Sequence, residues 1–399
     1  MQASDKKIFS VLFFSMFSTI TGVGIVVPLL PVWAHDLGAS GFYIGLIFGA
    51  FSLSRTFFLP FFGRISDKKG RKPFIVSGLL AYALISIAFI YAVDITSLVA
   101  IRFVQGIASA MIMPVTQAYV GEITPRGREG LSMGLFNLST FFGLSLGPLA
   151  GGLINDLFSL TAAFLCMGVL AMIGCLLSFF WLPPVSQEHN RCNDGNHYAK
   201  WSQLLKDKDI TGIFIFRLTY TICIGIIWCF LPVFADTEFS LSSSSIGVLV
   251  MLGVLISGLM NAPMGYLADR FDKKLLSVSG GLIIAFSICS FVWADGFYDL
   301  FLACVLFGIG GGTAMPSLTA LAVIKGRDTG SMGAVMALLT MAHSLGMLLG
   351  SLLAGFAMDW FDLRNAFPLG SILMIFGVIC FIVCLGKDKE NNKPAGYST

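Results

Sequence analysis

Residues 63–73 read GRISDKKGRKP and place five cationic side chains and one aspartate between two long apolar stretches. Charge is scarce elsewhere, because only 12% of the 399 residues are charged and 56% are hydrophobic. That much apolar surface exceeds what the core of a soluble protein holds. Stretches of about 20 apolar residues recur along the chain, and each is long enough to cross a bilayer as a helix. The composition therefore predicts an all-α, multi-pass membrane protein with residues 63–73 in a loop between two spans.

Apolar runs separated by polar breaks predict twelve membrane spans. They cover residues 8–34, 42–62, 73–93, 97–121, 131–154 and 160–182, followed by 210–235, 243–267, 275–294, 299–323, 331–357 and 363–385. Alternate loops collect most Lys and Arg residues, whereas the loops between them hold none apart from Arg364. Because Lys and Arg are retained on the inner side, we expect both chain termini in the cytoplasm. The expected location is the plasma membrane, which is the inner membrane if the protein is prokaryotic.

The two halves of the sequence repeat each other at a shift of about 202 residues. GRISD at 63–67 returns as GYLAD at 265–269, and GIASAMIMP at 106–114 returns as GIGGGTAMP at 308–316. We therefore predict four parts: a six-helix bundle over 1–182, a cytoplasmic loop over 183–209, a second six-helix bundle over 210–386 and a cytoplasmic tail over 387–399. Two such pseudo-symmetric halves with a substrate site between them are typical of secondary transporters.

This arrangement resembles the major facilitator superfamily, and the resemblance covers nearly the whole chain. The signature G-x-x-x-D-[RK]-x-G-[RK]-[RK] of that family is matched by Gly63, Asp67, Lys68, Gly70, Arg71 and Lys72. Its second copy keeps Gly265, Asp269 and Arg270 but has Asp272 where a glycine is expected.

The signature loop has a physical rationale of its own. Glycine suits a sharp turn or a close contact, and Arg71 can pair with a carboxylate such as Glu122 at the end of the fourth span. In the family such contacts brace one state of an alternating-access cycle, so the resemblance implies that Asp67 and Arg71 act as conformational latches. The alternative is a loop that only anchors the topology.

The fifth predicted span contains a spaced glycine pattern. Its residues fit G-x8-G-x3-G-P-x2-G-G at Gly134, Gly143, Gly147, Pro148, Gly151 and Gly152. This pattern resembles the antiporter signature of drug–proton exporters, although small residues also serve ordinary helix packing. The equivalent span of the second half has Gly346, Gly350 and Gly355 but lacks the Gly-Pro pair. The difference between the halves favours export over uptake.

Three arginines lie inside predicted spans, where a charge is costly and indicates function. Arg102 has Cys304 as its repeat partner, and Arg102-x-x-Gln105 resembles the fourth-span signature that the family associates with proton coupling. A structural pair with a polar neighbour is the alternative. Arg55 and Arg217 are, with Arg102, candidates for a substrate cavity. Because Arg217 lies about two turns from the cytoplasmic end, we predict that it snorkels to the surface.

Acidic residues are scarce where transport chemistry would use them. Tetracycline-type exporters of the family carry an aspartate in the first span, but Thr19 stands at that position here. Buried arginines without a clear carboxylate predict a cavity that favours neutral or anionic substrates over lipophilic cations. The proton carrier stays open among Asp36, Glu122 and His343.

These patterns predict a secondary transporter that exports drugs or neutral or anionic amphipathic compounds by proton-coupled alternating access. The alternative is a carrier of an anionic metabolite, by symport or facilitated exchange. The spans show no catalytic acid pair, nucleophile–base arrangement or Cys/His metal spacing, so we expect no enzyme, cofactor or metal site. A net charge of only +3 indicates no nucleic-acid surface. We expect a monomer in a lipid bilayer, with a small-molecule substrate and protons as partners.

Overall fold

The computed structural model describes residues 3–124, 129–183, 206–329, 332–360 and 363–385. In this part of the chain, twelve helices are long and apolar enough to cross a membrane, and no strand is present. The prediction of an all-α protein with twelve spans is therefore confirmed.

Among the described residues, the first half has six long helices, and the second half has six more with two short 3₁₀ turns. The first-half helices are α1 (Ala3–Asp36), α2 (Gly41–Lys69), α3 (Lys72–Ile90), α4 (Ile95–Ile123), α5 (Glu129–Leu157) and α6 (Leu160–Trp181). The second half has α8 (Lys208–Phe239), α9 (Ser243–Arg270), α10 (Lys273–Ser290), η2 (Phe291–Trp293), α11 (Phe297–Asp328), α12 (Met332–Trp360), η3 (Leu363–Asn365) and α13 (Ala366–Cys384). Several helices exceed the predicted spans, because apolar runs reveal the lipid-crossing part and not the polar ends. Most of the predicted linker and tail lies outside the described residues.

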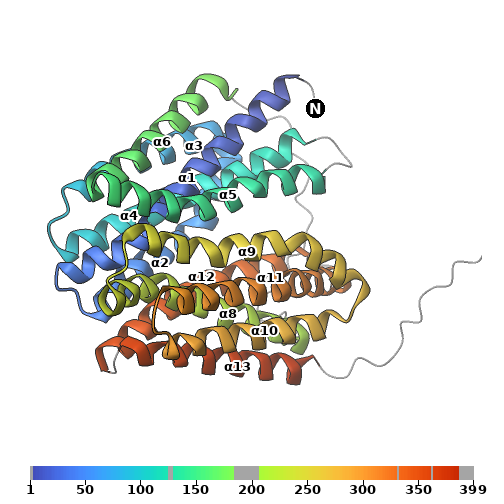
Figure 1. Ribbon diagram of the computed structural model, residues 1–399. Coiled ribbons are helices and arrows are strands. Elements are labelled where there is room, and N and C mark those ends of the chain that lie inside the picture. The colour runs from blue at the N-terminus through green and yellow to red at the C-terminus, as the bar shows by residue number, and fades with distance from the viewer. Residues whose placement is uncertain (1–2, 125–128, 184–205, 330–331, 361–362, 386–399) are drawn as a thin grey trace, which may run out of the picture.

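The two halves lie against each other mainly along three helix pairs. Figure 1 shows them one above the other, and α1 packs against α8, α2 against α12, and α5 against α9. The first turn of α1 and the last turn of α13 lie at the same end of the bundle (Figure 1). We call this the terminal end, and we call the opposite end, with the turns at 37–40 and 240–242, the distal end.

The stretch GRISDKKGRKP is mostly helical, so the prediction of a loop over 63–73 was wrong. Helix α2 continues to Lys69, only Gly70 and Arg71 break it, and α3 starts at Lys72. Gly70 has φ +88°, a conformation that favours glycine, whereas a side chain at Gly63 would meet no atom within 4 Å. Polar residues hid the last turns of α2, because a helix that leaves the bilayer no longer needs apolar residues.

The second copy of this junction joins its two helices with a different residue. Asp272, at the position of Gly70, has φ −62° and accepts a hydrogen bond at 2.8 Å from the backbone N–H of Lys274. It is thus the N-cap of α10, which gives an unsatisfied N–H a partner. Gly265 lies within α9 and, like Gly63, borders open space.

Glycines let paired helices approach to backbone contact in both halves. A Cβ at Gly147 of α5 would lie 2.8 Å from the Cα of Gly24 on α1. In the second half, a Cβ at Gly225 of α8 would lie 3.2 Å from the Cα of Gly350 on α12. Lipid supplies little hydrophobic drive for helix association, so close packing at small residues stabilises these pairs.

The substitutions Gly147→Ala and Gly63→Ala add the same methyl group to two different surroundings. At Gly147 the methyl group meets α1, and overpacking of this kind costs about 1–3 kcal/mol. At Gly63 it meets open space in a helix, where Ala is favoured over Gly by about 1 kcal/mol. We expect the unfolding temperature of the purified protein to fall for Gly147→Ala and to stay or rise for Gly63→Ala. Equal destabilisation by both changes would contradict a helical Gly63.

Candidate functional site

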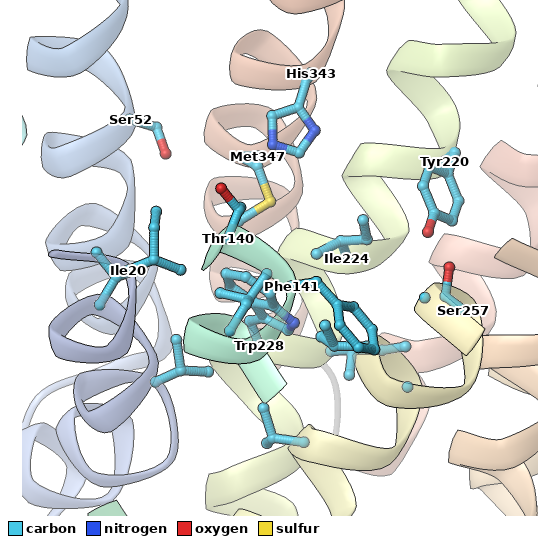
Figure 2. A pocket seen from close by; sticks show the side chains of 18 of the residues that line it. Ile20, Ser52, Thr140, Phe141, Tyr220, Ile224, Trp228, Ser257, His343 and Met347 are labelled. Atoms are coloured by element: carbon cyan, nitrogen blue, oxygen red, sulfur yellow. The ribbon is translucent and has the colours of Figure 1, made fainter. Parts of the chain in front are cut away.

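A cavity of about 480 Å³ lies between the two halves. Helices α1, α2, α4 and α5 of the first half and α8, α9, α11 and α12 of the second contribute to its wall. Figure 2 shows Ser52 of α2 and His343 of α12 facing the space from different halves. The polar side chains of the wall are Ser52, Arg55, Arg102, Ser109, Asn137, Thr140, Arg217, Tyr220, Ser257, Asn261, His343 and Ser344. Among the described residues that line the cavity, none is an aspartate or a glutamate.

Arg102 enters the cavity from α4 in an aromatic setting. Its side chain is 2% exposed and donates a hydrogen bond from Nη1 to Oε1 of Gln105 at 2.7 Å. The guanidinium carbon lies 4.9 Å from the ring centroid of Phe48 and 4.5 Å from that of Phe51, both on α2. These contacts stabilise the cation without neutralising it. Gly106 makes them possible, because a side chain there would overlap the carbonyl oxygen of Phe51.

Arg55 reaches the same cavity from α2 without a protein counter-ion. Its Nε is buried and lacks a hydrogen-bond partner, and no ion pair to Arg55 occurs among the described residues. Part of its side chain borders the cavity. An arginine keeps its charge in proteins, so Arg55 would attract a negatively charged group in the cavity.

Arg217 of α8 completes the set, and the prediction that it snorkels to the surface was wrong. Its Nη1 contacts Sδ of Met315 at 2.6 Å, and its Nη2 lies 3.4 Å from Nδ1 of His343. Arg217 does lie near the start of α8, as predicted, but its side chain faces the cavity and not lipid. Sequence spacing does not show which way a helix face points when the partner helix lies 126 positions further along the chain.

Among the described residues, the charged side chains that border the cavity are all cationic. Three guanidinium groups border it, with His343 beside Arg217 and no carboxylate in the wall. Two like unit charges about 4 Å apart repel by about 4 kcal/mol at an effective dielectric constant of about 20. A bound anion would therefore be attracted strongly, and a bound cation would be repelled.

The rest of the wall is apolar and deformable. It contains the aromatic residues Phe48, Phe51, Phe141, Trp228 and Phe307 and the methionines Met113, Met315 and Met347. The ring of Phe141 of α5 reaches the second half and lies against Gly258 of α9, where any side chain would overlap it. Figure 2 shows Phe141 and Trp228 on neighbouring parts of this wall. Such a surface suits a ligand with a large hydrophobic body.

Arg71 joins three helix ends near the terminal end. Its Nε and Nη2 donate to Oε1 of Glu122 at 3.0 and 2.9 Å, and its Nη1 donates to Oγ of Ser66 at 2.6 Å. The predicted pairing with Glu122 is thus confirmed. Lys72 places its Nζ 5.7 Å from the ring centroid of Phe179, and Lys68 is exposed. The side chain of Asp67 lies outside the described residues.

The structure separates the predicted proton-coupling residues. Arg102, with Gln105 bound to it, and His343 belong to the cavity region, from opposite halves. Asp36 is exposed at the distal end of α1 and does not line the cavity. Glu122 contacts Arg71 outside the cavity.

The second-half loop residues also lie away from the cavity. Arg270, at the end of α9, stacks 4.3 Å from the ring centroid of Tyr266. Gly265 belongs to the same helix, and the side chain of Asp269 lies outside the described residues. Neither Gly265 nor Arg270 is part of the cavity wall.

The glycine pattern of α5 is explained largely by packing. Gly143 faces Ile20 of α1, Gly151 faces Ile25, and Gly152 faces Ser243 of α9, whereas the surroundings of Gly134 lie outside the described residues. In the second half, Gly346 and Gly350 of α12 face α8 in the same manner. The two patterns therefore do equivalent packing work, and the main difference is Pro148 of α5 against Ser351 of α12.

Sequence reasoning missed several polar cavity residues. Asn137 and Asn261 lie inside apolar spans, and a polar side chain at membrane depth is itself a signal of function. Tyr220 and Ser257 carry weaker signals, since both residue types are common in membrane helices. Their convergence becomes visible only when the helices are placed around one space (Figure 2).

Curated relatives match the chain over most of its length. An uncharacterized MFS-type transporter of Methanocaldococcus jannaschii is 27% identical over 95% of this chain and 98% of its own. Multidrug resistance protein 2 of Bacillus subtilis is 26% identical over 98% of both chains. Quinolone resistance protein NorA of Staphylococcus aureus is 25% identical over 89% of this chain and 90% of its own.

Solved structures show the same fold at lower identity. A mutant of the nucleoside transporter NupG aligns with a TM-score of 0.80 at 14% identity, over 95% of this chain and 100% of its own. The human organic anion transporter MFSD10 aligns with a TM-score of 0.67 at 17% identity, over 96% of this chain and 100% of its own. The family model described as Major Facilitator Superfamily matches residues 12–332 and 213–397. With twelve spans in two repeated halves around one cavity, the chain belongs to the Major Facilitator Superfamily.

Proposed function

We propose that this transporter exports neutral or anionic amphipathic compounds by alternating access, coupled to inward proton flow. The observation that carries the proposal is the cavity wall, in which Arg55, Arg102 and Arg217 face one space with no carboxylate among the described lining residues. Aromatic and methionine side chains form most of the remaining wall. A substrate with an apolar body and an anionic or hydrogen-bond-accepting group complements both features.

The names of two relatives support the direction of transport, and two pairs of side chains at the cavity support proton coupling. Two relatives carry names that denote drug resistance, at 26% and 25% identity, and export is the activity those names suggest. His343, beside Arg217, is the candidate at the cavity that can carry a proton, and Arg102 with Gln105 is the candidate pair that would couple its movement to the substrate. Both pairs are positioned so that a bound anion changes the charge around them. Proton and substrate binding would then be linked through the same space.

A second candidate function is the transport of an anionic metabolite by symport or facilitated exchange. The pair Arg217 and His343 favours it, because an anion bound at Arg217 would stabilise a proton on the adjacent imidazole. Anion and proton would then bind together and move in the same direction. The two candidates therefore predict opposite proton movements for the same substrate.

Transport of charged and neutral ligands can be compared with the protein in liposomes that contain a pH-sensitive dye and are more acidic inside. Three ligands share one skeleton: anilinonaphthalene bearing a sulfonate, no charge, or a trimethylammonium group. We expect uptake of the sulfonate and of the neutral compound with a rise of internal pH, and no uptake of the cation. A fall of internal pH with the sulfonate would support the symporter instead. Transport of the cation at a rate equal to that of the sulfonate would refute the charge argument.

Arg217→Gln should weaken binding of an anionic ligand more than binding of a neutral one. A hydrogen bond to a charged group contributes about 1.5–3 kcal/mol, so the affinity for anilinonaphthalene sulfonate should fall about 10- to 100-fold. The affinity for the neutral compound should change by less than about threefold, since it lacks the charge that Arg217 attracts. Fluorescence titration in nanodiscs measures both affinities. Arg327→Gln, an equal change at an exposed helix end, is the control and should alter neither.

We also propose that Arg71 and Glu122 act as a latch that stabilises one state of the cycle. Both guanidinium contacts converge on one carboxylate oxygen and join the start of α3 to the end of α4, so the contact breaks only when these two helix ends shift against each other. Glu122→Gln should therefore lower the maximal transport rate about tenfold while leaving substrate affinity within about twofold. Lys69→Gln, an exposed change in the same segment, should leave the rate unchanged. An equal loss of substrate affinity in Glu122→Gln would contradict a latch.

A further inference from the structure

Two contacts between the halves at the distal end repeat each other. The first joins the start of α2 to the end of α12, and the second joins the start of α9 to the end of α5. In each contact an aspartate of one half binds the first backbone N–H groups of a helix in the other half. Figure 1 shows α5 and α9 side by side across the boundary between the halves.

The aspartate contacts have the geometry of helix caps supplied by the opposite half. Asp359 accepts hydrogen bonds from the backbone N–H of Gly41 at 2.6 Å and of Phe42 at 2.9 Å, one at each carboxylate oxygen. Asp156 accepts from the N–H of Ser243 at 3.1 Å and of Ser244 at 2.7 Å, again with both oxygens. Helix N-termini have N–H groups without intrahelical partners and a partial positive charge, so a carboxylate is well matched to them.

A glycine four residues before each aspartate allows the close approach. A Cβ at Gly355 would overlap the carbonyl oxygen of Gly41, and a Cβ at Gly152 would overlap that of Ser243. Each glycine therefore lies against the same helix start that its aspartate caps. Asn155 adds a hydrogen bond of 2.9 Å from Nδ2 to Oγ of Ser243 at the second contact.

The two contacts are copies produced by the internal repeat. Residues Gly152 and Asp156 correspond to Gly355 and Asp359 at a shift of 203, and 41–42 correspond to 243–244 at a shift of 202. The repeated element is therefore Gly-x-x-x-Asp at the distal ends of α5 and α12. Nothing in the packing of either half alone requires these aspartates, because their partners belong to the other half.

The four helices joined in this way also line the cavity. Arg55 lies on α2, Phe141 on α5, Ser257 on α9 and His343 on α12. Separation of the halves at the distal end would have to break both caps. We propose that Asp156 and Asp359, each with its glycine, form a two-part distal lock that closes the cavity toward the distal side and is released as a unit when that side opens.

The lock makes a prediction for hydrogen exchange of the unaltered protein in nanodiscs. In the described structure the backbone N–H groups of 41–42 and 243–244 bond to the aspartates, so loss of these bonds should speed their exchange. After correction for intrinsic exchange rates, 41–42 and 243–244 should exchange with equal protection. Protection that differs by more than about tenfold would overturn release as a unit.

A variant separates the lock from two independent caps. Asp359→Asn should raise exchange about tenfold at 41–42 and also at 243–244, because loosening one contact frees the other. Asp94→Asn is the matched control, since Asp94 caps α4 within its own half by accepting from the N–H of Ser97 at 2.7 Å. It should raise exchange only near 95–98. If Asp359→Asn acts only at 41–42, the aspartates are local caps and the lock is refuted.

A second variant covers the case in which Asp359→Asn does not fold. Gly355→Ala leaves the aspartate in place but wedges the start of α2 away from α12. We expect it to raise exchange at both 41–42 and 243–244, whereas Gly63→Ala, which meets open space in the same helix α2, should raise neither. These readings do not depend on substrate or protons. The lock can therefore fail while the proposed transport function stands, and the reverse also holds.

Discussion

The fold depends on backbone-to-backbone contact between helices, which only glycine permits at these positions. Gly24 with Gly147 holds α1 to α5, and Gly225 with Gly350 holds α8 to α12. In lipid, a leucine gains little by leaving one apolar surface for another, so shape complementarity between helices determines which pairs form. Gly152 and Gly355 make the same kind of contact between the halves, which lie close enough at their distal ends for one half to cap the helices of the other.

The cavity is cationic although the helix bundle around it is apolar and tightly packed. Arg102 contacts two aromatic rings and an amide, and Arg217 contacts a thioether and an imidazole. Arg55 makes no hydrogen bond within the described structure. None of these partners carries a negative charge. Buried charges are retained in membrane proteins where function uses them, and here an incoming ligand is the natural source of the missing charge.

Features marked by residue type or by repetition could be predicted from the sequence, and features set by the rotation of a helix could not. Apolar runs located the spans, the repeat showed two equivalent halves, and opposite charges paired Arg71 with Glu122. The helical state of Gly63 was missed because polar residues end a lipid-crossing run before they end a helix. The direction of Arg217 and its contact with His343 depend on helix rotation, which spacing from a helix end does not reveal.

The distal aspartates carried a signal that could have been found in the sequence. Gly-x-x-x-Asp occurs at 152–156 and again at 355–359, at the shift of the repeat. An element that both halves share works through symmetry, so a difference between the halves, such as Arg102 against Cys304, does not point to it. Its partners are backbone N–H groups, which every residue except proline has, so the other side of the contact leaves no trace in the residue types.

Asp156 and Asp359 are both exposed to solvent. Water can therefore replace each backbone N–H as it is withdrawn, and the carboxylate is never left without a partner. A seal made of interlocking apolar side chains would expose hydrocarbon to water each time it separated, and the exposed area would oppose opening. A seal of hydratable contacts has nearly balanced end states, so modest differences in ligand binding are enough to decide which side of the membrane the cavity faces.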